Sequence, residues 1–288
     1  MRLLSASSRL LLVLAAVLVA GPALAQSDAW RAYPAYNEVD VVAAAPDGLW
    51  AGTRAGLFFY AIPDGEIVPY TVVDGPRGGE IGALAYDEAR GVLWVGYADG
   101  LLERLDPETG RVTPFYAIVR ADQYPSRGVR RIRVFGDDLY LGTDFGVVVF
   151  STTREEVRDT YARIGDLAAG TPVNDLVEAP RPDGTPGLWL ATEGGLYHAD
   201  RGGSNLQTPT AWSKDAGLHG AAFSLATFDG TLYAGGGPAD LKDLYRREAD
   251  GAWSRTVFTN NRITAIEPRG DALLAITSAF VYLVRPGQ

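Results

Sequence analysis

The two histidines of the chain, His198 and His219, are the first residues to consider for catalysis or metal binding. They do not form a His-x-x-His or His-Glu-x-x-His pattern, which is the spacing that brings two imidazoles onto one zinc ion. Cysteine is absent, which excludes disulfides and thiolate metal sites. The sequence therefore predicts no catalytic residue and no metal site, and we expect no cofactor.

The densest group of basic residues is Arg130, Arg131 and Arg133. Side chains alternate between the two faces of a β-strand, so Arg131 and Arg133 would point to the same side. Guanidinium groups pair well with phosphate and carboxylate, which makes this pair suitable for an anionic ligand. We expect Arg131 and Arg133 to line a channel and to be the best single place for an anion.

An internal repeat supplies the elements that must position these residues. The stretch from Leu49 to Phe58, with the sequence LWAGTRAGLF, recurs with variation five more times. Its aromatic position, or the equivalent one, falls at residues 50, 94, 140, 189, 233 and 274, at spacings of 41 to 49 residues. This period is typical of β-propeller blades. We therefore predict an all-β fold, a single propeller of about six four-stranded blades, or seven if the chain is truncated.

The aromatic residues of the repeat are expected to pack between blades and not to form a ligand cage. Trp50, Trp94 and Trp189 would each bury on the order of 200 Å² as wedges between neighbouring sheets. The segment Ala29–Tyr33 resembles the outer strands near Trp212 and Trp253. It predicts that an N-terminal outer strand completes the last blade and closes the ring, which would remove exposed strand edges.

The first 25 residues have the composition of a secretory signal peptide. A basic start with Arg2 and Arg9 precedes an apolar run from Leu10 to Ala20 and a small-x-small site at Ala23–Ala25. A membrane anchor is the weaker interpretation, because the run is shorter than the roughly 20 residues that span a bilayer. We expect residues 1–25 to be a signal peptide, residues 26–288 to be the propeller domain, and no integral membrane segment to remain after cleavage.

The formal net charge of −9 bears on the partners of the exported protein. Removal of the leader takes away two arginines and no acid, so the mature chain is more acidic still. An acidic surface repels phosphate backbones, so nucleic acid and anionic membranes are poor partners for the body of the protein.

The candidate binding residues lie on the face where the second-to-third-strand hairpins and the connections between blades meet around the channel. Loops on a rigid scaffold are where binding is usually carried. Besides Arg131 and Arg133, the candidates on this face are Arg54, Asp99, Asp144 and Glu193 from the hairpins and His219 and Arg262 from the connections. Solvated loop tips are the alternative interpretation of these residues. His198, in contrast, is expected at an exposed outer position of a third strand.

The repeat resembles a known propeller family. The pattern Leu-Trp-x-Gly-Thr-x-x-Gly-Leu, preceded by Asn-x-apolar at Asn37, Asn174 and Asn261, is similar to the two-component-regulator propeller repeat. More narrowly, Trp30, Tyr33, Tyr36 and Asn37 followed by the Trp50 blade resemble the N-terminal β-propeller of the PorZ family. The resemblance implies an accessory of type IX protein secretion in Bacteroidota, in the periplasm or at the outer surface of a Gram-negative cell.

Three functions follow from these observations. The expected one is a binding module without enzymatic activity, whose partners are a surface glycan, anionic lipopolysaccharide or other secretion-machinery proteins, as the family resemblance implies. The first alternative is a periplasmic ligand-sensing propeller of a two-component system. The second is a propeller lyase or lactonase, which would need metal ligands or histidines around the channel.

Overall fold

The computed structural model describes residues 39–54, 56–70, 76–77, 79–202, 205–238, 243–257, 262–277 and 279–285. By its internal contacts the chain divides into residues 1–33 and 34–288, and all described residues belong to the second unit. The predicted signal peptide and the predicted closing strand at Ala29–Tyr33 therefore lie outside the described residues.

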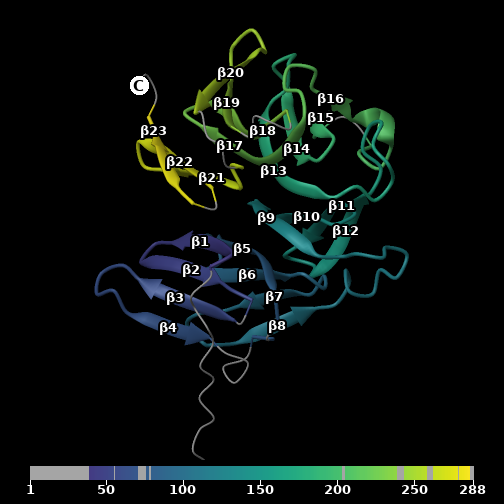
Figure 1. Ribbon diagram of the computed structural model, residues 1–288. Helices are drawn as coiled ribbons and strands as arrows, with labels where there is room; N and C mark the ends of the chain where they lie inside the picture. The colour runs from purple at the N-terminus through teal and green to yellow at the C-terminus, as the bar shows by residue number, and fades with distance from the viewer. Residues whose placement is uncertain are drawn as a thin grey trace, which may run out of the picture. The chain divides into compact units, whose positions relative to one another are not determined.

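The described residues form six antiparallel sheets, one for each sequence repeat, which make up a six-bladed β-propeller (Figure 1). The first blade contains β1 (Val41–Ala45), β2 (Gly48–Gly52), β3 (Leu57–Ala61) and β4 (Ile67–Tyr70). The second contains β5 (Ile81–Asp87), β6 (Val92–Tyr97), β7 (Leu102–Leu105) and β8 (Val112–Phe115). The third contains β9 (Val129–Phe135), β10 (Asp138–Thr143), β11 (Gly146–Ser151) and β12 (Glu156–Tyr161). The fourth blade contains β13 (Val173–Pro180), β14 (Pro186–Thr192), β15 (Gly195–Asp200) and β16 (Ser213–Lys214). The fifth contains β17 (Ala221–Phe228), β18 (Thr231–Gly237), β19 (Asp243–Arg247) and β20 (Trp253–Val257). The sixth contains β21 (Ala265–Arg269), β22 (Ala272–Ile276) and β23 (Val281–Val284).

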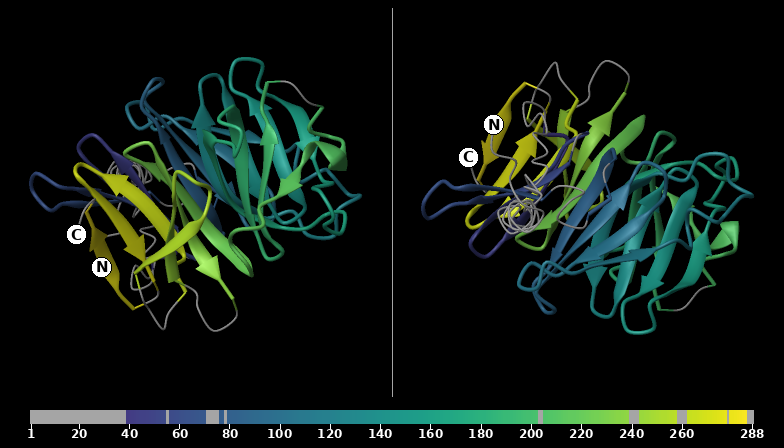
Figure 2. Two further views of the ribbon diagram at one scale, coloured as in Figure 1. Left: turned by 90° about the horizontal axis from the view of Figure 1, so that it is seen from above. Right: turned by 90° about the horizontal axis from the view of Figure 1, so that it is seen from below.

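Each sheet is a meander whose strands pair in chain order, as the repeat predicts. The prediction of six blades is confirmed, and the sixth sheet has three strands among the described residues. The sheets follow one another along the chain, and both views in Figure 2 place the first and last sheets on the same side of the domain. The 3-10 helix η1 (Pro209–Ala211) precedes β16, and the described residues contain no helix of the length and apolar character that a membrane span requires.

A threonine hydroxyl closes the hairpin between the second and third strands of several blades. Thr53, Thr143 and Thr192 donate their side-chain hydroxyls to the carbonyl oxygens of Gly56, Gly146 and Gly195, three residues later, at 3.0, 2.9 and 2.8 Å. Gly146 has φ of 134°, and a Cβ on it would lie 2.2 Å from the Tyr161 carbonyl oxygen. At Gly146 the hairpin therefore requires glycine, because a side chain there would be strained and would collide with the Tyr161 carbonyl.

The predicted wedge residues are buried between successive blades. Trp50, Trp94 and Trp189 are 2%, 0% and 0% exposed. Trp94 packs with Ile132 and Leu141 of the next blade, and the other blade interfaces repeat this arrangement around Trp50, Tyr140, Trp189 and Tyr233. The packing interpretation of the tryptophans is confirmed, and the hydrophobic core is a series of layers between sheets.

Candidate functional site

A β-bulge recurs at the start of the innermost strand in four consecutive blades. In the second blade, Ile81 pairs with Tyr97 and Ala83 with Gly96, which leaves Gly82 without a partner across the strands. The third, fourth and fifth blades have the same irregularity, and the residues it leaves unpaired are Arg130, Asn174 and Phe223. A classic role of a bulge is to re-aim one side chain away from the regular ladder.

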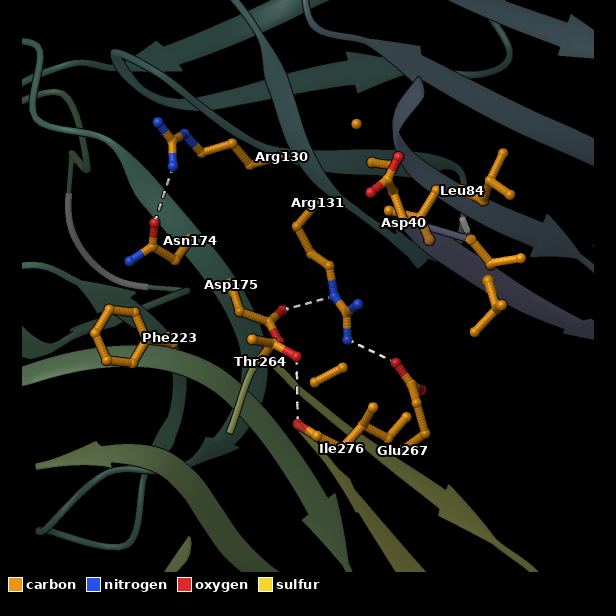
Figure 3. Close-up of a pocket in the computed structure, with 16 residues that line it drawn as sticks. Asp40, Leu84, Arg130, Arg131, Asn174, Asp175, Phe223, Thr264, Glu267 and Ile276 are labelled. Carbon is orange, nitrogen blue, oxygen red and sulfur yellow. Dashed lines mark hydrogen bonds and ion pairs between the residues drawn. The ribbon is translucent and has the colours of Figure 1, made fainter. Parts of the chain in front are cut away.

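These bulge residues and their counterparts in the other two blades surround one cavity. In the first and sixth blades the equivalent residues directly precede the paired strand and are Asp40 and Thr264. We call Asp40, Gly82, Arg130, Asn174, Phe223 and Thr264 the mouth ring. All six line a cavity of about 320 Å³ (Figure 3). The ring takes one residue from each blade, and no two of the six are alike.

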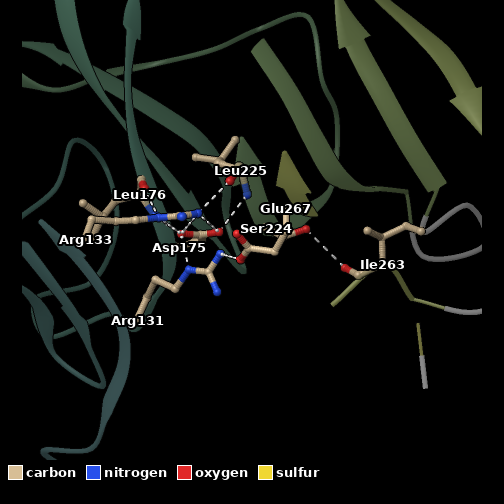
Figure 4. Close-up of polar contacts among 8 residues, drawn as sticks. All are labelled: Arg131, Arg133, Asp175, Leu176, Ser224, Leu225, Ile263 and Glu267. Atoms are coloured by element: carbon tan, nitrogen blue, oxygen red, sulfur yellow. Dashed lines mark hydrogen bonds and ion pairs between the residues drawn. The ribbon is translucent and has the colours of Figure 1, made fainter. Parts of the chain in front are cut away.

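A network of charged side chains lies beside this cavity, which Arg131, Asp175 and Glu267 line (Figure 4). Asp175 of β13 is 1% exposed and accepts hydrogen bonds from Arg131 Nε at 3.0 Å and Arg133 Nη2 at 3.1 Å. The backbone amides of Leu176 and Leu225 donate to the same carboxylate at 2.7 and 3.0 Å. We call Arg131, Arg133, Asp175 and Glu267 the channel network.

The channel network joins four blades through their innermost strands. Arg131 of β9 reaches Glu267 of β21 at 2.7 Å as well as Asp175 of β13. Arg133 also donates to the carbonyl oxygens of Leu176 and Leu225, at 3.1 and 2.9 Å. Arg131 and Arg133 thus share one side of their strand, and both form ion pairs with protein carboxylates; of the two, Arg131 lines the cavity.

The pKa of Arg131 is raised and the pKa of Arg133 is lowered. Burial disfavours both charged guanidinium groups. For Arg131 the charges of Asp175 and Glu267 outweigh burial and raise the pKa. For Arg133 burial and the like charge of Arg131 together lower the pKa, although Asp175 and Glu267 oppose that change. Arg131 is therefore the more strongly compensated member of the pair.

Arg262 stands at the rim of the cavity with its charge uncompensated. Its guanidinium carbon lies 4.0 Å from the ring centroid of Phe223, a cation–π contact. The side chain is exposed, and in the described part of the chain no carboxylate lies within ion-pair distance of it. Among the predicted binding residues, Arg262 has the geometry of a cation that is available to a ligand.

Asp144 and Asp99 are held by neighbouring groups. Asp144 accepts hydrogen bonds from Arg130 Nε at 2.5 Å, from Ser126 Oγ at 2.5 Å and from the amide of Gly128 at 2.9 Å. Asp99 pairs with Arg77 at 2.9 Å and accepts the Leu101 amide at 3.0 Å. Both carboxylates therefore hold their loops in place.

The remaining hairpin and connection residues are not brought together by the fold. Arg54 is largely exposed, and its nearest carboxylate is Asp40 at 4.0 Å. Glu193 is exposed in the β14–β15 hairpin, and His219 is exposed in the connection from β16 to β17. The structure thus separates the predicted residues into a buried pair, two held carboxylates, the rim cation Arg262 and three exposed loop residues.

The prediction that His198 is exposed is wrong. His198 is 8% exposed because it is the cross-strand partner of Trp189, and the two rings lie 4.6 Å apart. Arg247 of the next blade covers the same indole, with its guanidinium carbon 5.3 Å from the ring centroid. Burial lowers the pKa of His198. His198 is therefore a packing residue between blades.

Several lining residues were missed at the level of sequence. Asn174 accepts a hydrogen bond from Arg130 and donates one to the carbonyl oxygen of Ala222, at 3.3 and 3.0 Å. The repeated Asn-x-apolar pattern would have pointed to Asn174. Phe223, Thr264 and the acidic partners Asp175 and Glu267 carry no sequence signal, because their positions depend on bulges and on contacts between distant segments. Among the described residues, no group of three His, Cys, Asp or Glu side chains is arranged to hold a metal ion.

Comparisons with known proteins found one matching family and several similar solved structures. Residues 49–213 match the family described as the N-terminal β-propeller domain of PorZ of the type IX secretion system. The structure is similar to PorZ of Porphyromonas gingivalis, a bacterial surface component of that system, with a TM-score of 0.69 and 21% identity over 87% of this chain and 32% of that one.

Two extracellular domains from B. thetaiotaomicron are similar as well. The domain of BT4673, described as a one-component system, gives a TM-score of 0.67 at 19% identity over 86% of this chain and 33% of that one. The domain of BT3049, described as a hybrid two-component system, gives 0.62 at 18% identity over 88% and 34%. The search of curated proteins gave no match. The chain spans about a third of the length of these three solved chains.

Proposed function

The chain belongs to the family of PorZ N-terminal β-propeller domains, and from this membership we propose that it is an exported binding module that acts as an accessory of type IX protein secretion. Its proposed role is to bind a partner and not to catalyse a reaction. The signal peptide at residues 1–25 directs the propeller at residues 26–288 to the periplasm or the outer cell surface. Its partners are an anionic surface glycan such as lipopolysaccharide, or other proteins of the secretion machinery.

The mouth ring is the observation that carries this proposal. Residues that repeat alike from blade to blade, such as the wedge tryptophans, serve packing. The ring positions occupy equivalent places in the blades and yet differ in every blade. The hydrogen bonds of Arg130 and Asn174 to their neighbours do not give a reason for bulges in consecutive blades to aim a guanidinium, an amide and a phenyl ring at one cavity. A ligand that contacts all of them would give such a reason.

The chemistry of the ring suits an anionic sugar. Phe223 offers an aromatic surface, and Asn174 and Thr264 offer hydrogen-bonding groups. The charges of Arg130 and Asp144 offset each other, and Asp40 faces Arg54 at 4.0 Å. Arg262 remains as the uncompensated charge at the rim, so we expect the anionic group of the ligand beside Arg262 and Phe223.

A charge reversal at the rim tests the proposal. Arg262→Glu should reduce binding to immobilised smooth lipopolysaccharide by about tenfold or more, the loss of one charge-assisted contact of roughly 1.5–3 kcal/mol. Arg269→Glu is the matched control, because Arg269 is exposed at the opposite end of β21 and the charge change is the same. Equal binding by the Arg262 variant and the wild type, or an equal loss in the control, would overturn the proposal.

Ligand sensing is the second candidate function, and the likeness to the extracellular domains of BT4673 and BT3049 favours it. A sensor propeller would bind a small free saccharide at the same mouth ring. Purified lipopolysaccharide and free oligosaccharides released from it would separate the two functions. A module of the secretion machinery retains the intact lipopolysaccharide at the surface, whereas a sensor responds to the free saccharide alone.

A further inference from the structure

A second cavity opens beside the mouth ring, between the two longest connections from one blade to the next. These connections are residues 116–128, between β8 and β9, and residues 162–172, between β12 and β13. The cavity has a volume of about 560 Å³. We call it the loop groove. The residues that matter for its chemistry are Gln123, Tyr124, Pro125, Phe145, Arg163 and Pro172.

The two connections are internally braced. In the first, Ile118 is 4% exposed and anchors the loop in the core, while Arg127 ties the carbonyl oxygen of Val119 to the carboxylate of Asp122 at 2.9 and 2.8 Å. In the second, Ile164 is 2% exposed, and the amide of Gly170 donates to the carbonyl oxygen of Ala162 at 2.9 Å. The groove is therefore preformed, which lowers the entropic cost of binding a ligand.

The floor of the loop groove is aromatic. The rings of Tyr124 and Phe145 are stacked with centroids 3.9 Å apart and planes 7° apart. Phe145 is 3% exposed, so its ring supports Tyr124 from below, and Tyr124 remains half-buried at the surface of the groove. Pro125 and Pro172 extend this apolar surface. Flat apolar surfaces of this kind suit the face of a sugar ring.

The charge of the groove comes from Arg163. Its side chain is exposed, and within the described ranges no hydrogen bond or ion pair engages it. The acid in the groove, Asp144, is engaged by Arg130, Ser126 and the amide of Gly128. The exposed amide of Gln123 adds a neutral hydrogen-bonding group. The groove thus combines an aromatic floor with one free guanidinium.

The groove and the mouth ring each share lining residues with one neighbouring cavity. This further cavity of about 370 Å³ shares lining residues with both, and its charged and polar lining residues are Arg130, Asn174, Asp144 and Glu80. Arg130 and Asn174 also belong to the mouth ring, and Asp144 also lines the loop groove. A chain of sugar units could therefore run from the mouth ring across the Arg130–Asp144 pair into the loop groove.

We propose that the loop groove is a second subsite, which binds an acidic sugar unit of the same linear glycan whose neighbouring unit occupies the mouth ring. Arg163 pairs with the carboxylate or phosphate of that unit, and Tyr124 packs against its ring. This inference rests on the proposed function, since it assumes that the mouth ring binds a glycan. It specifies the ligand further as an oligosaccharide with acidic groups on more than one unit.

Calorimetric titration with trigalacturonate, galacturonate and the neutral trimer maltotriose tests this inference. The wild-type protein should bind trigalacturonate more tightly than either of the other two. Arg163→Glu should weaken trigalacturonate binding at least tenfold, to about the level of galacturonate. Arg120→Glu is the matched control, because Arg120 is exposed on the same connection, contacts Tyr116 and does not line the groove.

The variants distinguish failure of the subsite from failure of the proposed function. If Arg163→Glu binds trigalacturonate like the wild type while Arg262→Glu loses it, the groove is no subsite and the mouth ring still binds. If Arg163→Glu loses binding and Arg262→Glu does not, the groove binds alone and the mouth ring has no such role. No preference of the wild type for trigalacturonate over maltotriose would overturn both proposals.

Discussion

The arginines of the channel network and those of the loop face carry the same charge and have opposite surroundings. Arg131 and Arg133 converge on Asp175, a carboxylate that is 1% exposed, and their own side chains are about one-fifth exposed. Arg262 and Arg163 are exposed and have no carboxylate partner among the described residues. The density of arginines in the sequence predicts the first pair as the anion site, and in the structure both arginines pair with protein carboxylates.

The difference follows from the cost of burying charge. A guanidinium in the channel must be compensated by the protein, because an unpaired buried charge costs several kcal/mol. A guanidinium at the rim keeps its hydration until a ligand replaces it, and an exposed pair would add little to stability. We therefore expect the compensated arginines to contribute to the stability of the fold and the exposed arginines to contribute little to it.

Removal of Asp175 should have the largest effect. Asp175→Ala leaves Arg131 and Arg133 beside each other with Glu267 as their remaining acid, and it frees the amides of Leu176 and Leu225. We expect the free energy of unfolding to fall by about 3–5 kcal/mol, the usual cost of breaking a buried ion pair from one side. Chemical denaturation would measure it. A loss below about 1 kcal/mol would mean that the network is not structural.

The blades could be predicted from the sequence, and the channel network could not. The repeat period, the Gly-Thr hairpin and the wedge tryptophans are local signals, and each led to the observed structure. Arg131 and Asp175 lie 44 residues apart, and Arg131 and Glu267 lie 136 apart, so only the packing of separate blades around one cavity joins them. The bulges that aim Asn174 and Phe223 are likewise a property of strand register, which a one-residue slip changes completely.

His198 shows the limit of reasoning from repeats. It occupies the place that Arg104 has in the second blade, since Trp189 pairs with His198 as Trp94 pairs with Arg104. Arg104 reaches over the indole and keeps its guanidinium partly exposed, at 28% of the side chain. The shorter imidazole cannot reach out and is buried on the ring. The two equivalent positions therefore share the contact with tryptophan and differ in exposure.

Glu103 is a buried carboxylate in different surroundings from Asp175. Replacing it should change the free energy of unfolding less than replacing Asp175 does. Glu103 is 3% exposed and accepts the Tyr97 hydroxyl at 2.6 Å and the Arg77 amide at 3.2 Å, so its hydrogen-bond donors are neutral. Burial raises the pKa of Glu103, although these hydrogen bonds oppose the shift. Asp175, in contrast, accepts hydrogen bonds from the guanidinium groups of Arg131 and Arg133.

Glu103→Gln should therefore change how stability depends on pH. A raised pKa means that the folded protein holds this proton more tightly than the unfolded chain does. The free energy of unfolding thus falls as the pH rises from the ordinary glutamate range near 4.5 through the raised value. The amide cannot ionise, so the stability of the variant relative to the wild type should increase over that interval. Thermal melts between about pH 4 and pH 7 would show it, and parallel pH profiles would contradict it.

Removing the charge of the exposed residues Arg262 and Arg163 should have the smallest effect on the free energy of unfolding. Arg262→Ala and Arg163→Ala remove exposed side chains that contact no carboxylate in the described part of the chain, so each should change the free energy of unfolding by less than about 0.5 kcal/mol. Arg131→Ala in the channel should cost several times more, because it leaves Glu267 and part of Asp175 without a cation. The three variants remove the same charge, so their denaturation curves isolate the effect of position. A rim variant as unstable as the channel variant would mean that both sets of arginines hold the fold, and the separation between structural and recognition arginines would fail.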